Sequence, residues 1–228
     1  MDYTKWNFKS QESKLLALGI PNNNTSDFDA IVASRWARKD ELISRLNISL
    51  LDRVLDLGSG MGFLAEAIAP HAAKIYCADI SDTFLDDCRR RVSLLDNVEV
   101  QKVGYADLSA LYGRQINKVY ATLLFIHFNF YDIVFYLQEL NKVMDIEGLL
   151  YFDYNDGERF SFEEKTESFN GHLAIYKENR EHWVFGCMHM TSYGILKNLA
   201  PQLGFQLLNN WPSSSVFSCM LMEKIRHL

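Results

Sequence analysis

The sequence predicts a doubly wound α/β domain built on a mostly parallel β-sheet. Between residues 51 and 154, short apolar runs alternate with amphipathic segments, an order typical of parallel strands joined by helices. A glycine-rich turn follows the first apolar run, as at strand–helix junctions that hold a ligand. The chain has 228 residues and 48% of them are hydrophobic, which is enough for one domain with a sizeable core.

Residues 1–50 are expected to form an N-terminal helical cap. Apolar residues at helical spacing predict one long helix over 26–47, with Thr25 or Ser26 as its N-cap. A helix in this position would pack beside the sheet and reach over a ligand site at its edge.

Residues 51–154 are expected to form the ligand-binding core, with right-handed crossovers between successive strands. Strands are predicted at 53–57, 74–79, 98–103, 117–124 and 148–154. Helices are predicted at 62–70, 82–95 and 131–145, with a short helical turn near 107–112.

The remainder of the chain divides into two parts. Residues 155–190 are rich in aromatic and charged residues, and they are expected to form a hairpin or lid over the carboxyl edge of the sheet. Residues 191–228 return to a regular pattern, with a helix predicted at about 191–202 and strands near 205–210 and 216–224.

The first strand runs into a glycine turn with the pattern D-x-G-x-G-x-G, formed by Asp56, Gly58, Gly60 and Gly62. Glycine lets the backbone turn tightly and leaves no Cβ between the backbone and a ligand. The helix that opens after the turn points its unpaired N–H groups at whatever lies above it. A dinucleotide fingerprint needs a third glycine where this chain has Phe63, so the turn favours a different nucleotide-like ligand.

The segment Val54–Gly62 resembles the first motif of the class I S-adenosylmethionine (SAM)-dependent methyltransferases, and the resemblance extends over about residues 50–155. The two-strand ending of the chain also resembles the antiparallel sixth and seventh strands of that family. The resemblance implies a Rossmann-like methyltransferase fold with a mostly parallel seven-stranded sheet and an antiparallel C-terminal strand pair. It also implies SAM as the cofactor and S-adenosylhomocysteine (SAH) as the product.

The same resemblance implies which residues contact the adenosine part of SAM. Asp79 ends the second predicted strand, where a carboxylate of the family binds both ribose hydroxyls, and a helix cap is the alternative. The family often has Gly-Asp-Ala after the third strand, whereas this chain has Tyr105 and then Asp107, so either side chain can contact adenine. A helix N-cap is the alternative for Asp107. The predicted cofactor-binding residues are Asp56, Gly58, Gly60, Gly62, Asp79, Ile80, Tyr105, Ala106, Asp107, Leu123 and Arg35.

The amino-acid part of SAM is implied to lie near the first and fourth strands. In the family, the backbone after the fourth strand, here at Leu123, lies beside the methionine, and Asp56 is expected close by. Arg35 and Arg38 precede the first strand and can pair with the carboxylate of the methionine. A solvated helix face is the alternative for both arginines.

Methyl transfer from a sulfonium is an in-line displacement in which the enzyme mainly aligns the reacting atoms. A hydroxyl or ammonium acceptor must also lose a proton, and His127, just after the fourth strand, is the best-placed candidate base. Packing in an aromatic cluster is the alternative for His127. Asp153 and His189 are the other predicted catalytic residues, with turn chemistry as the alternative for Asp153. Their spacing matches no metal motif, so no metal is predicted.

The composition of the chain disfavours some classes of binding partner and cellular environment. The net charge of −6 and the lack of a strongly basic stretch disfavour a nucleic-acid substrate, and the lack of a run of about 18 apolar residues disfavours a membrane span. The four cysteines form no C-x-x-C pair, so a reduced cytoplasmic protein is expected, with Cys77 and Cys88 in the core. A small-molecule acceptor is expected, such as a sugar, an amine or a natural-product intermediate, and a homodimer is left open.

Other functions remain as alternatives. A protein or nucleic-acid methyltransferase is disfavoured because the fourth strand runs into Leu-Phe-Ile-His-Phe rather than the [Asp/Asn]-Pro-Pro-aromatic turn of the amino-methylating enzymes. The same fold also serves aminopropyl transferases and non-catalytic SAM-binding modules. A nicotinamide dehydrogenase is disfavoured by Phe63 and by the two-strand ending.

Overall fold

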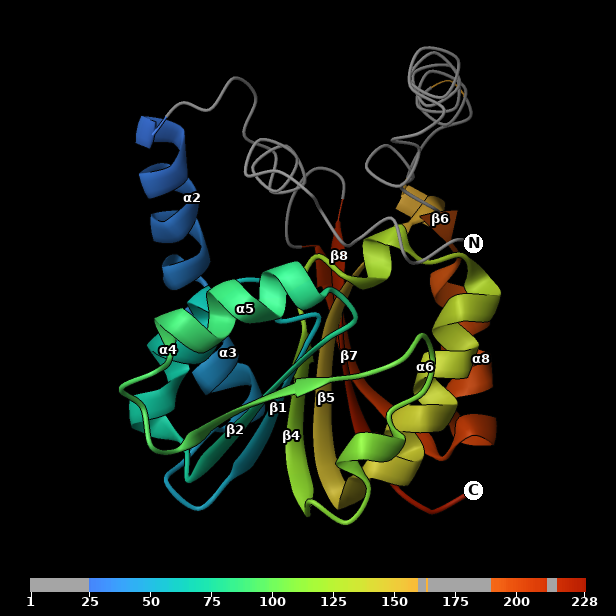
Figure 1. Cartoon of the computed structure of the whole chain (residues 1–228). Coiled ribbons are helices and arrows are strands. Elements are labelled where there is room, and N and C mark those ends of the chain that lie inside the picture. The colour runs from blue at the N-terminus through green and yellow to red at the C-terminus, as the bar shows by residue number, and fades with distance from the viewer. Residues whose placement is uncertain (1–24, 160–162, 164–189, 213–216) are drawn as a thin grey trace.

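A central β-sheet lies between two layers of helices in the computed structural model, which describes residues 25–159, 163, 190–212 and 217–228 (Figure 1). The strands are β1 (Arg53–Leu57), β2 (Lys74–Asp79), β3 (Val98–Lys102), β4 (Ile116–Ala121), β5 (Met144–Asp156), β6 (Met190–Thr191), β7 (Phe205–Pro212) and β8 (Ser218–Lys224). The α-helices are α2 (Thr25–Ala37), α3 (Lys39–Leu46), α4 (Phe63–Ile68), α5 (Asp82–Arg91), α6 (Phe130–Val143) and α8 (Tyr193–Leu199). The short 3-10 helices are η3 (Ala69–His71), η4 (Ser109–Leu111), η5 (Phe125–His127), η6 (Gly157–Arg159) and η8 (Ala200–Leu203).

Among the described residues, the strands of the sheet follow the order β3-β2-β1-β4-β5-β8-β7. Strands β1 to β5 pair in parallel, whereas β8 pairs antiparallel with both β5 and β7. This arrangement confirms the predicted mostly parallel seven-stranded sheet with an antiparallel C-terminal pair. The two-residue strand β6, which pairs in parallel with β5, is an addition that the sequence did not predict.

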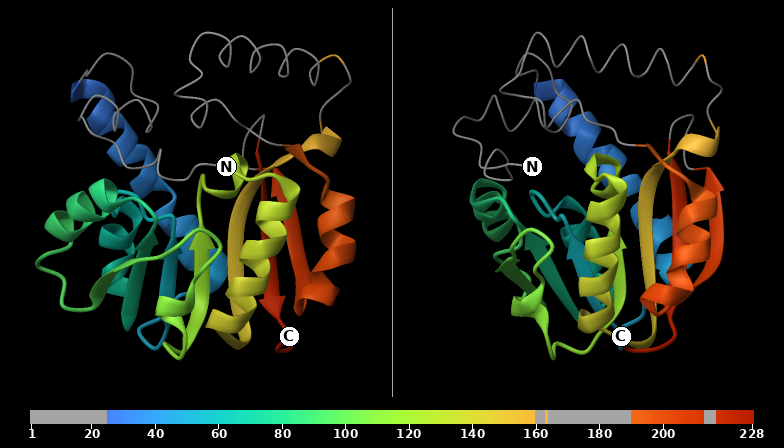
Figure 2. Two further views of the ribbon diagram at one scale, coloured as in Figure 1. Left: turned by 45° about the vertical axis from the view of Figure 1, so that its right-hand side comes forward. Right: turned by 90° about the vertical axis from the view of Figure 1, so that its right-hand side faces the viewer.

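The central parallel strands are buried on both faces, and their sequences are accordingly rich in apolar residues on both sides of the strand. Helices α3, α4 and α5 cover one face, and their side chains, such as Leu42, Ile68 and Cys88, form one core cluster with the sheet. Helices α6 and α8 cover the other face through residues such as Leu140 and Leu196. These helices lie over the two faces of the sheet, and the carboxyl ends of the parallel strands lie at an edge between the two helical layers (Figure 2).

The helix predicted over 26–47 is two helices, because the chain breaks at Arg38 between α2 and α3. Helix α3 packs on the sheet through its buried Leu42 and Leu46, whereas α2 projects past the carboxyl ends of the strands (Figure 1). At the break, the guanidinium of Arg38 donates to the carboxylate of Asp153 on β5 at 2.9 Å. Apolar spacing did not reveal the break, since both halves keep helical periodicity.

Three further boundaries differ from the prediction. Strand β4 ends before Leu123, whose φ of 54° lies in the left-handed region that a strand cannot contain. Helix α5 ends at Arg91, because Val92 leaves the helical conformation as its C-cap. Strand β5 is longer than the predicted 148–154 at both ends. Most of the predicted lid over 155–190 lies outside the described residues.

Candidate functional site

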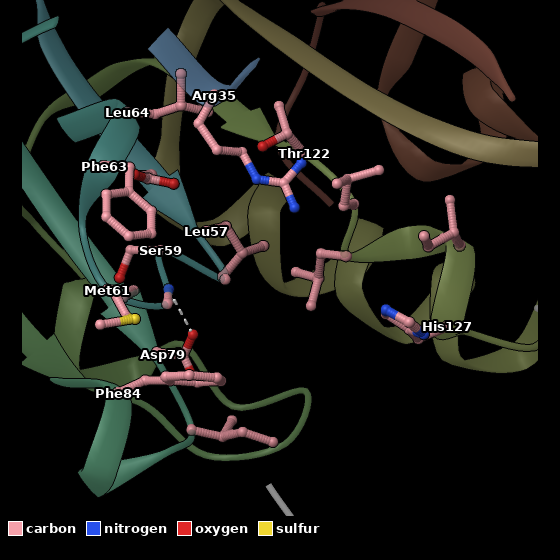
Figure 3. A pocket seen from close by; sticks show the side chains of 18 of the residues that line it. Arg35, Leu57, Ser59, Met61, Phe63, Leu64, Asp79, Phe84, Thr122 and His127 are labelled. Atoms are coloured by element: carbon pink, nitrogen blue, oxygen red, sulfur yellow. Dashed lines mark hydrogen bonds between the residues drawn. The ribbon is translucent and has the colours of Figure 1, made fainter. Parts of the chain in front are cut away.

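A cavity of about 390 Å³ opens at the carboxyl ends of β1, β2 and β4, and this volume is typical of a small-molecule site. Side chains from α2, from the glycine turn and from the segments after β2 and β4 point into it (Figure 3). Most of the wall is apolar, with a few polar groups that can orient a ligand. The wall is formed by Arg35, Asp56, Leu57, Gly58, Ser59, Gly60, Met61, Phe63, Leu64, Ala78, Asp79, Ile80, Phe84, Val103, Thr122, Leu123, Leu124, Ile126, His127, Phe128, Tyr136 and Phe217.

The three glycines of the turn have different surroundings. At Gly60, which has a φ of 50°, a Cβ atom would meet no other atom within 4 Å, so its place lies in the cavity. At Gly58, a Cβ atom would lie 2.9 Å from a methyl carbon of Leu124. At Gly62, it would lie 2.7 Å from Sγ of Cys88 on α5, and Gly62 does not line the cavity. One glycine therefore leaves room for a ligand, and the other two allow close packing.

Asp56 lines the cavity and is the penultimate residue of β1, just before the glycines. Its side chain is buried, and its Oδ2 atom has no hydrogen-bond partner among the described residues. Burial raises the pKa of the carboxyl to about 7, and the charge of Asp79 adds to the rise, whereas the Tyr120 hydroxyl and the backbone of Ala65 oppose it. A buried acceptor of this kind suits a cationic group of a bound ligand.

Asp79 lies at the end of β2, as predicted, and on the wall of the cavity. Its Oδ2 accepts the N–H of Gly60 at 2.9 Å, and its Oδ1 accepts the N–H of Ser81 at 2.8 Å. Burial raises the pKa of Asp79, and these backbone donors oppose the rise. The N-cap of α5 is Ser81, so Asp79 is not the cap itself. Ile80, the next residue, also lines the cavity.

Arg35 projects from α2 into the cavity, which Thr122 also lines (Figure 3). Within the described part of the chain its guanidinium has no hydrogen bond or ion pair. Burial lowers the pKa of Arg35 and the nearby charge of Arg38 lowers it further, whereas Asp153 raises it. Arg35 therefore lies in the cavity wall and not on a solvated helix face, which was the alternative considered from the sequence.

The segment after β4 is held in place by Asp153. The backbone N–H of Leu123 donates to Oδ1 of Asp153 at 2.6 Å, and Arg38 occupies Oδ2 at 2.9 Å. Asp153 is completely buried and does not line the cavity, whereas Leu123 does. This placement differs from the expectation that Asp153 would act on the substrate, because its side chain is completely buried behind the cavity wall.

The residues predicted to contact adenine from the third strand lie away from the cavity wall. The hydroxyl of Tyr105 donates to Asp132 of α6, and Asp107 accepts the N–H of Ser109 at 3.0 Å at the start of η4. Ala106 occupies the turn between them, with a φ of 44°. The bond of Asp107 is thus local, but the N-cap of η4 is Leu108, so Asp107 is not the helix N-cap considered as its alternative.

His127 ends η5 and lines the cavity. Figure 3 shows it at one end of the cavity, with Asp79 and Phe84 at the other. Phe125 and Phe128, its neighbours in the chain, pack together at 5.3 Å and support η5 from the core. His189, the remaining predicted catalytic residue, lies outside the described residues.

Several wall residues carried no sequence signal of a ligand site. The helical spacing of Phe84 indicates only a core residue on the apolar face of α5. Ser59 and Thr122 lie outside helices and strands, where a polar residue is common. The Oγ atom of Ser59 is buried with no hydrogen-bond partner among the described residues. Phe217 comes from the segment before β8, which only the tertiary fold brings to this edge.

The structure also bears on the cysteines. Cys77 and Cys88 are buried free thiols, which confirms the prediction that they belong to the core.

Within the described ranges, no group of three or more His, Cys, Asp or Glu side chains is placed to hold a metal ion. No described helix is both long and apolar enough to span a bilayer.

Residues 54–148 match the family model of a methyltransferase domain. The match contains β1 to β4 and the glycine turn, and therefore most of the cavity wall. Residues 54–148 are therefore a methyltransferase domain, and the sheet that contains them has the class I SAM-dependent methyltransferase fold. SAM is the cofactor of the methyltransferase domain, and the open space over Gly60, the buried carboxylate of Asp56 and the partly buried carboxylate of Asp79 fit such a cofactor. No curated protein matches the sequence.

Solved structures share the fold of the methyltransferase at low sequence identity. The magnesium protoporphyrin IX methyltransferase from Synechocystis PCC 6803 with bound SAM has a TM-score of 0.64 and 15% identity, over 98% of this chain and 94% of that chain. A SAM-dependent methyltransferase from Aquifex aeolicus has a TM-score of 0.60 and 14% identity, over 82% and 89% of the two chains. One from Clostridium acetobutylicum ATCC 824 has a TM-score of 0.61 and 11% identity, over 85% and 92%.

Proposed function

We propose that the protein transfers the methyl group of SAM to an oxygen or nitrogen atom of a small polar metabolite, such as a sugar, an amine or a natural-product intermediate. The observation that carries the proposal is the single cavity wall that joins the open turn at Gly60 to His127. One part of this wall has the groups that a nucleoside and an amino acid need. The other part presents an ionisable side chain where an acceptor can approach.

The polar residues of the wall match the parts of SAM. Asp79 would accept hydrogen bonds from the ribose hydroxyls, and the apolar side chains of Ile80 and Phe84 would flank the adenine. Asp56 would hold the ammonium group of the methionine, and Arg35 its carboxylate. The opposite charges of these two side chains suit a zwitterionic amino acid better than any other part of the cofactor.

When bound, SAM supplies a methyl group on a cationic sulfur that is already a good leaving group. The protein has to align the acceptor with that methyl group and keep water out, and such positioning supplies roughly 7–11 kcal/mol. His127 would take the proton that the acceptor loses. Since Nδ1 of His127 is buried, Nε2 is the nitrogen that would accept this proton.

The proposal is tested by calorimetric titration of the purified protein with SAH, with NAD as the control ligand. Binding of SAH alone supports the assignment and leads to a screen of amines and sugars for SAM-dependent methylation. Binding of NAD, or of neither ligand by a folded sample, contradicts it.

Replacing Arg35 with methionine should weaken SAH binding and spare 5′-methylthioadenosine, which has the adenosine and thioether but no amino acid. A hydrogen bond between charged groups contributes about 1.5–3 kcal/mol, so the expected loss for SAH is roughly ten- to hundredfold. Calorimetry with both ligands measures it. Arg45→Met is the matched control, because Arg45 lies on α3 outside the cavity and stacks on Trp211. Equal losses for the two ligands would show that Arg35 does not bind the carboxylate.

The affinity for SAH should rise as the pH increases from about 6 to about 8. The pKa of Asp56 is raised to about 7 in the free protein, and the ligand ammonium favours the ionised carboxylate, so binding near neutral pH releases a proton. At one pH unit below this pKa, the affinity for SAH should be about tenfold lower than at a pH where Asp56 is fully ionised. Titrations in two buffers of different ionisation enthalpy count the proton. Asp56→Asn should flatten the profile, and a slope that persists in this variant would assign the proton to another group.

The raised pKa of Asp56 affects the stability of the free protein in the opposite direction, so that this stability falls where the affinity for SAH rises. Because the pKa of Asp56 is raised above the value of 3.8 expected without burial, the folded state binds the proton more tightly than the unfolded state. The contribution of Asp56 to the free energy of unfolding is therefore present below pH 4 and is lost as the pH rises through about 7.

A further inference from the structure

Asp153 lies behind the cavity wall and connects two parts of it. Its side chain is completely buried. One oxygen accepts the backbone N–H of Leu123 at 2.6 Å, and the other accepts Nη1 of Arg38 at 2.9 Å. These partners belong to the segment after β4 and to the junction of α2 with α3, which are far apart in the sequence.

The first contact fixes a strained piece of backbone. Leu123 has a φ of 54°, a conformation that costs a residue with a side chain roughly 1–2 kcal/mol. A charge-assisted hydrogen bond to its N–H offsets part of that cost. The next residue, Leu124, covers Gly58 so closely that a Cβ atom there would lie 2.9 Å from it. Asp153 thus determines how the segment after β4 lies against the glycine turn.

The second contact reaches Arg35 through one turn of helix. Arg38 donates Nη1 to Asp153 and Nη2 to the hydroxyl of Tyr151 at 3.2 Å. Its backbone N–H bonds to the carbonyl oxygen of Arg35 at 3.1 Å, so the two arginines share a turn at the end of α2. With Arg38 tied to β5, this turn has a fixed position, and the Arg35 side chain extends from it into the cavity.

We propose that Asp153 is a positioning residue for the amino-acid end of SAM, which it serves by holding the Leu123 backbone and, through Arg38, the guanidinium of Arg35. The inference rests on the proposed function and deepens it. Both contacts of Asp153 converge on the amino-acid end of the cavity, whereas the adenosine end is built by Asp79, Ile80 and Phe84 on β2 and α5. The removal of Asp153 therefore weakens the grip on one part of the ligand only.

The test compares SAH with 5′-methylthioadenosine in an Asp153→Asn variant of the full chain. Asparagine keeps an oxygen for the N–H of Leu123 but loses the ion pair with Arg38. The expected result is an affinity for SAH at least about tenfold lower, with the affinity for 5′-methylthioadenosine unchanged. A purely structural role would lower both affinities together, and either that outcome or an unchanged affinity for SAH overturns the proposal.

A second variant keeps the test decisive if the first one unfolds, because Arg38 is partly buried and loses its ion-pair partner in Asp153→Asn. The double variant Arg38→Met/Asp153→Asn leaves no unpaired charge and retains the apolar stem of residue 38. It should fold, bind 5′-methylthioadenosine normally and still show the selective loss of SAH affinity. A folded double variant that binds SAH as tightly as the unmodified protein overturns the proposal.

Asp52→Asn is the matched control. Asp52 is another buried carboxylate, but it lies before β1 at the opposite edge of the sheet, where it accepts from Ser49 and from Asn117 at 2.7 Å. Its substitution should lower the melting temperature without changing the ratio of the two affinities. If the unmodified protein does not bind SAH, the proposed function fails and this inference with it. If the unmodified protein binds SAH and Asp153→Asn loses nothing selectively, only this inference fails.

Discussion

A Gly60→Val variant should lose SAH binding by more than about a hundredfold, which corresponds to about 2.7 kcal/mol. A side chain at this position projects into the cavity, because a Cβ atom there meets nothing within 4 Å. It would occupy the space over the turn that the cofactor needs. Calorimetry with SAH gives the affinity, and the melting temperature of the free variant shows that the fold remains.

The control for this variant separates cavity filling from backbone strain. Gly113 also has a left-handed φ, at 74°, and open space around the position of its Cβ, but it lies outside the cavity wall. Gly113→Val therefore carries the same conformational cost and should leave the affinity for SAH unchanged. If Gly60→Val binds SAH normally, the glycine turn is not the cofactor site.

A His127→Ala variant should turn over about 10²- to 10⁴-fold more slowly, the usual contribution of a general base, while it binds SAH with unchanged affinity. The separation is expected because His127 lies at one end of the cavity and Asp79 and Phe84, which are proposed to bind the nucleoside, lie at the other (Figure 3). The measurement is the rate of SAM-dependent methylation of an acceptor found in the screen, together with its pH profile. The profile should lose its acidic limb in the variant.

His71→Ala is the control for the loss of an imidazole, because His71 is an exposed residue of η3 outside the cavity wall. It should retain full activity. Full activity in His127→Ala would instead assign His127 to packing on η5, and the proton would then leave the acceptor without this base.

Local patterns were enough to predict the part of the site that lies on consecutive residues. The apolar run of β1, the glycine turn and Asp79 at the end of β2 depend on strand and turn preferences within a short segment. The antiparallel ending was predictable only through its resemblance to a known family. These elements place the cofactor edge of the sheet without any tertiary information.

The rest of the site depends on contacts between distant residues. Arg38 and Asp153 are separated by 115 positions in the chain, and nothing in the local sequence of either residue indicates the pair. The left-handed conformation of Leu123 is likewise held by an acceptor 30 residues away. The sequence pattern assigned Tyr105 or Asp107 to adenine, but both side chains bond within the protein instead. Tyr105 bonds to Asp132 of α6, and Asp107 bonds to Ser109 of η4.

Arg35 and Asp153 both lie outside the segment 54–148 that matches the methyltransferase domain model. Two of the residues proposed to grip or position the amino acid are therefore encoded outside the stretch that carries the proposed adenosine pocket, whereas Asp56 and Leu123 lie within that stretch. Substitutions in α2 can change how sharply the protein distinguishes SAM from nucleosides that lack the amino acid, without any change to the glycine motif. A chimaera that exchanged residues 25–50 with another enzyme of this fold would exchange that discrimination and keep the adenosine pocket.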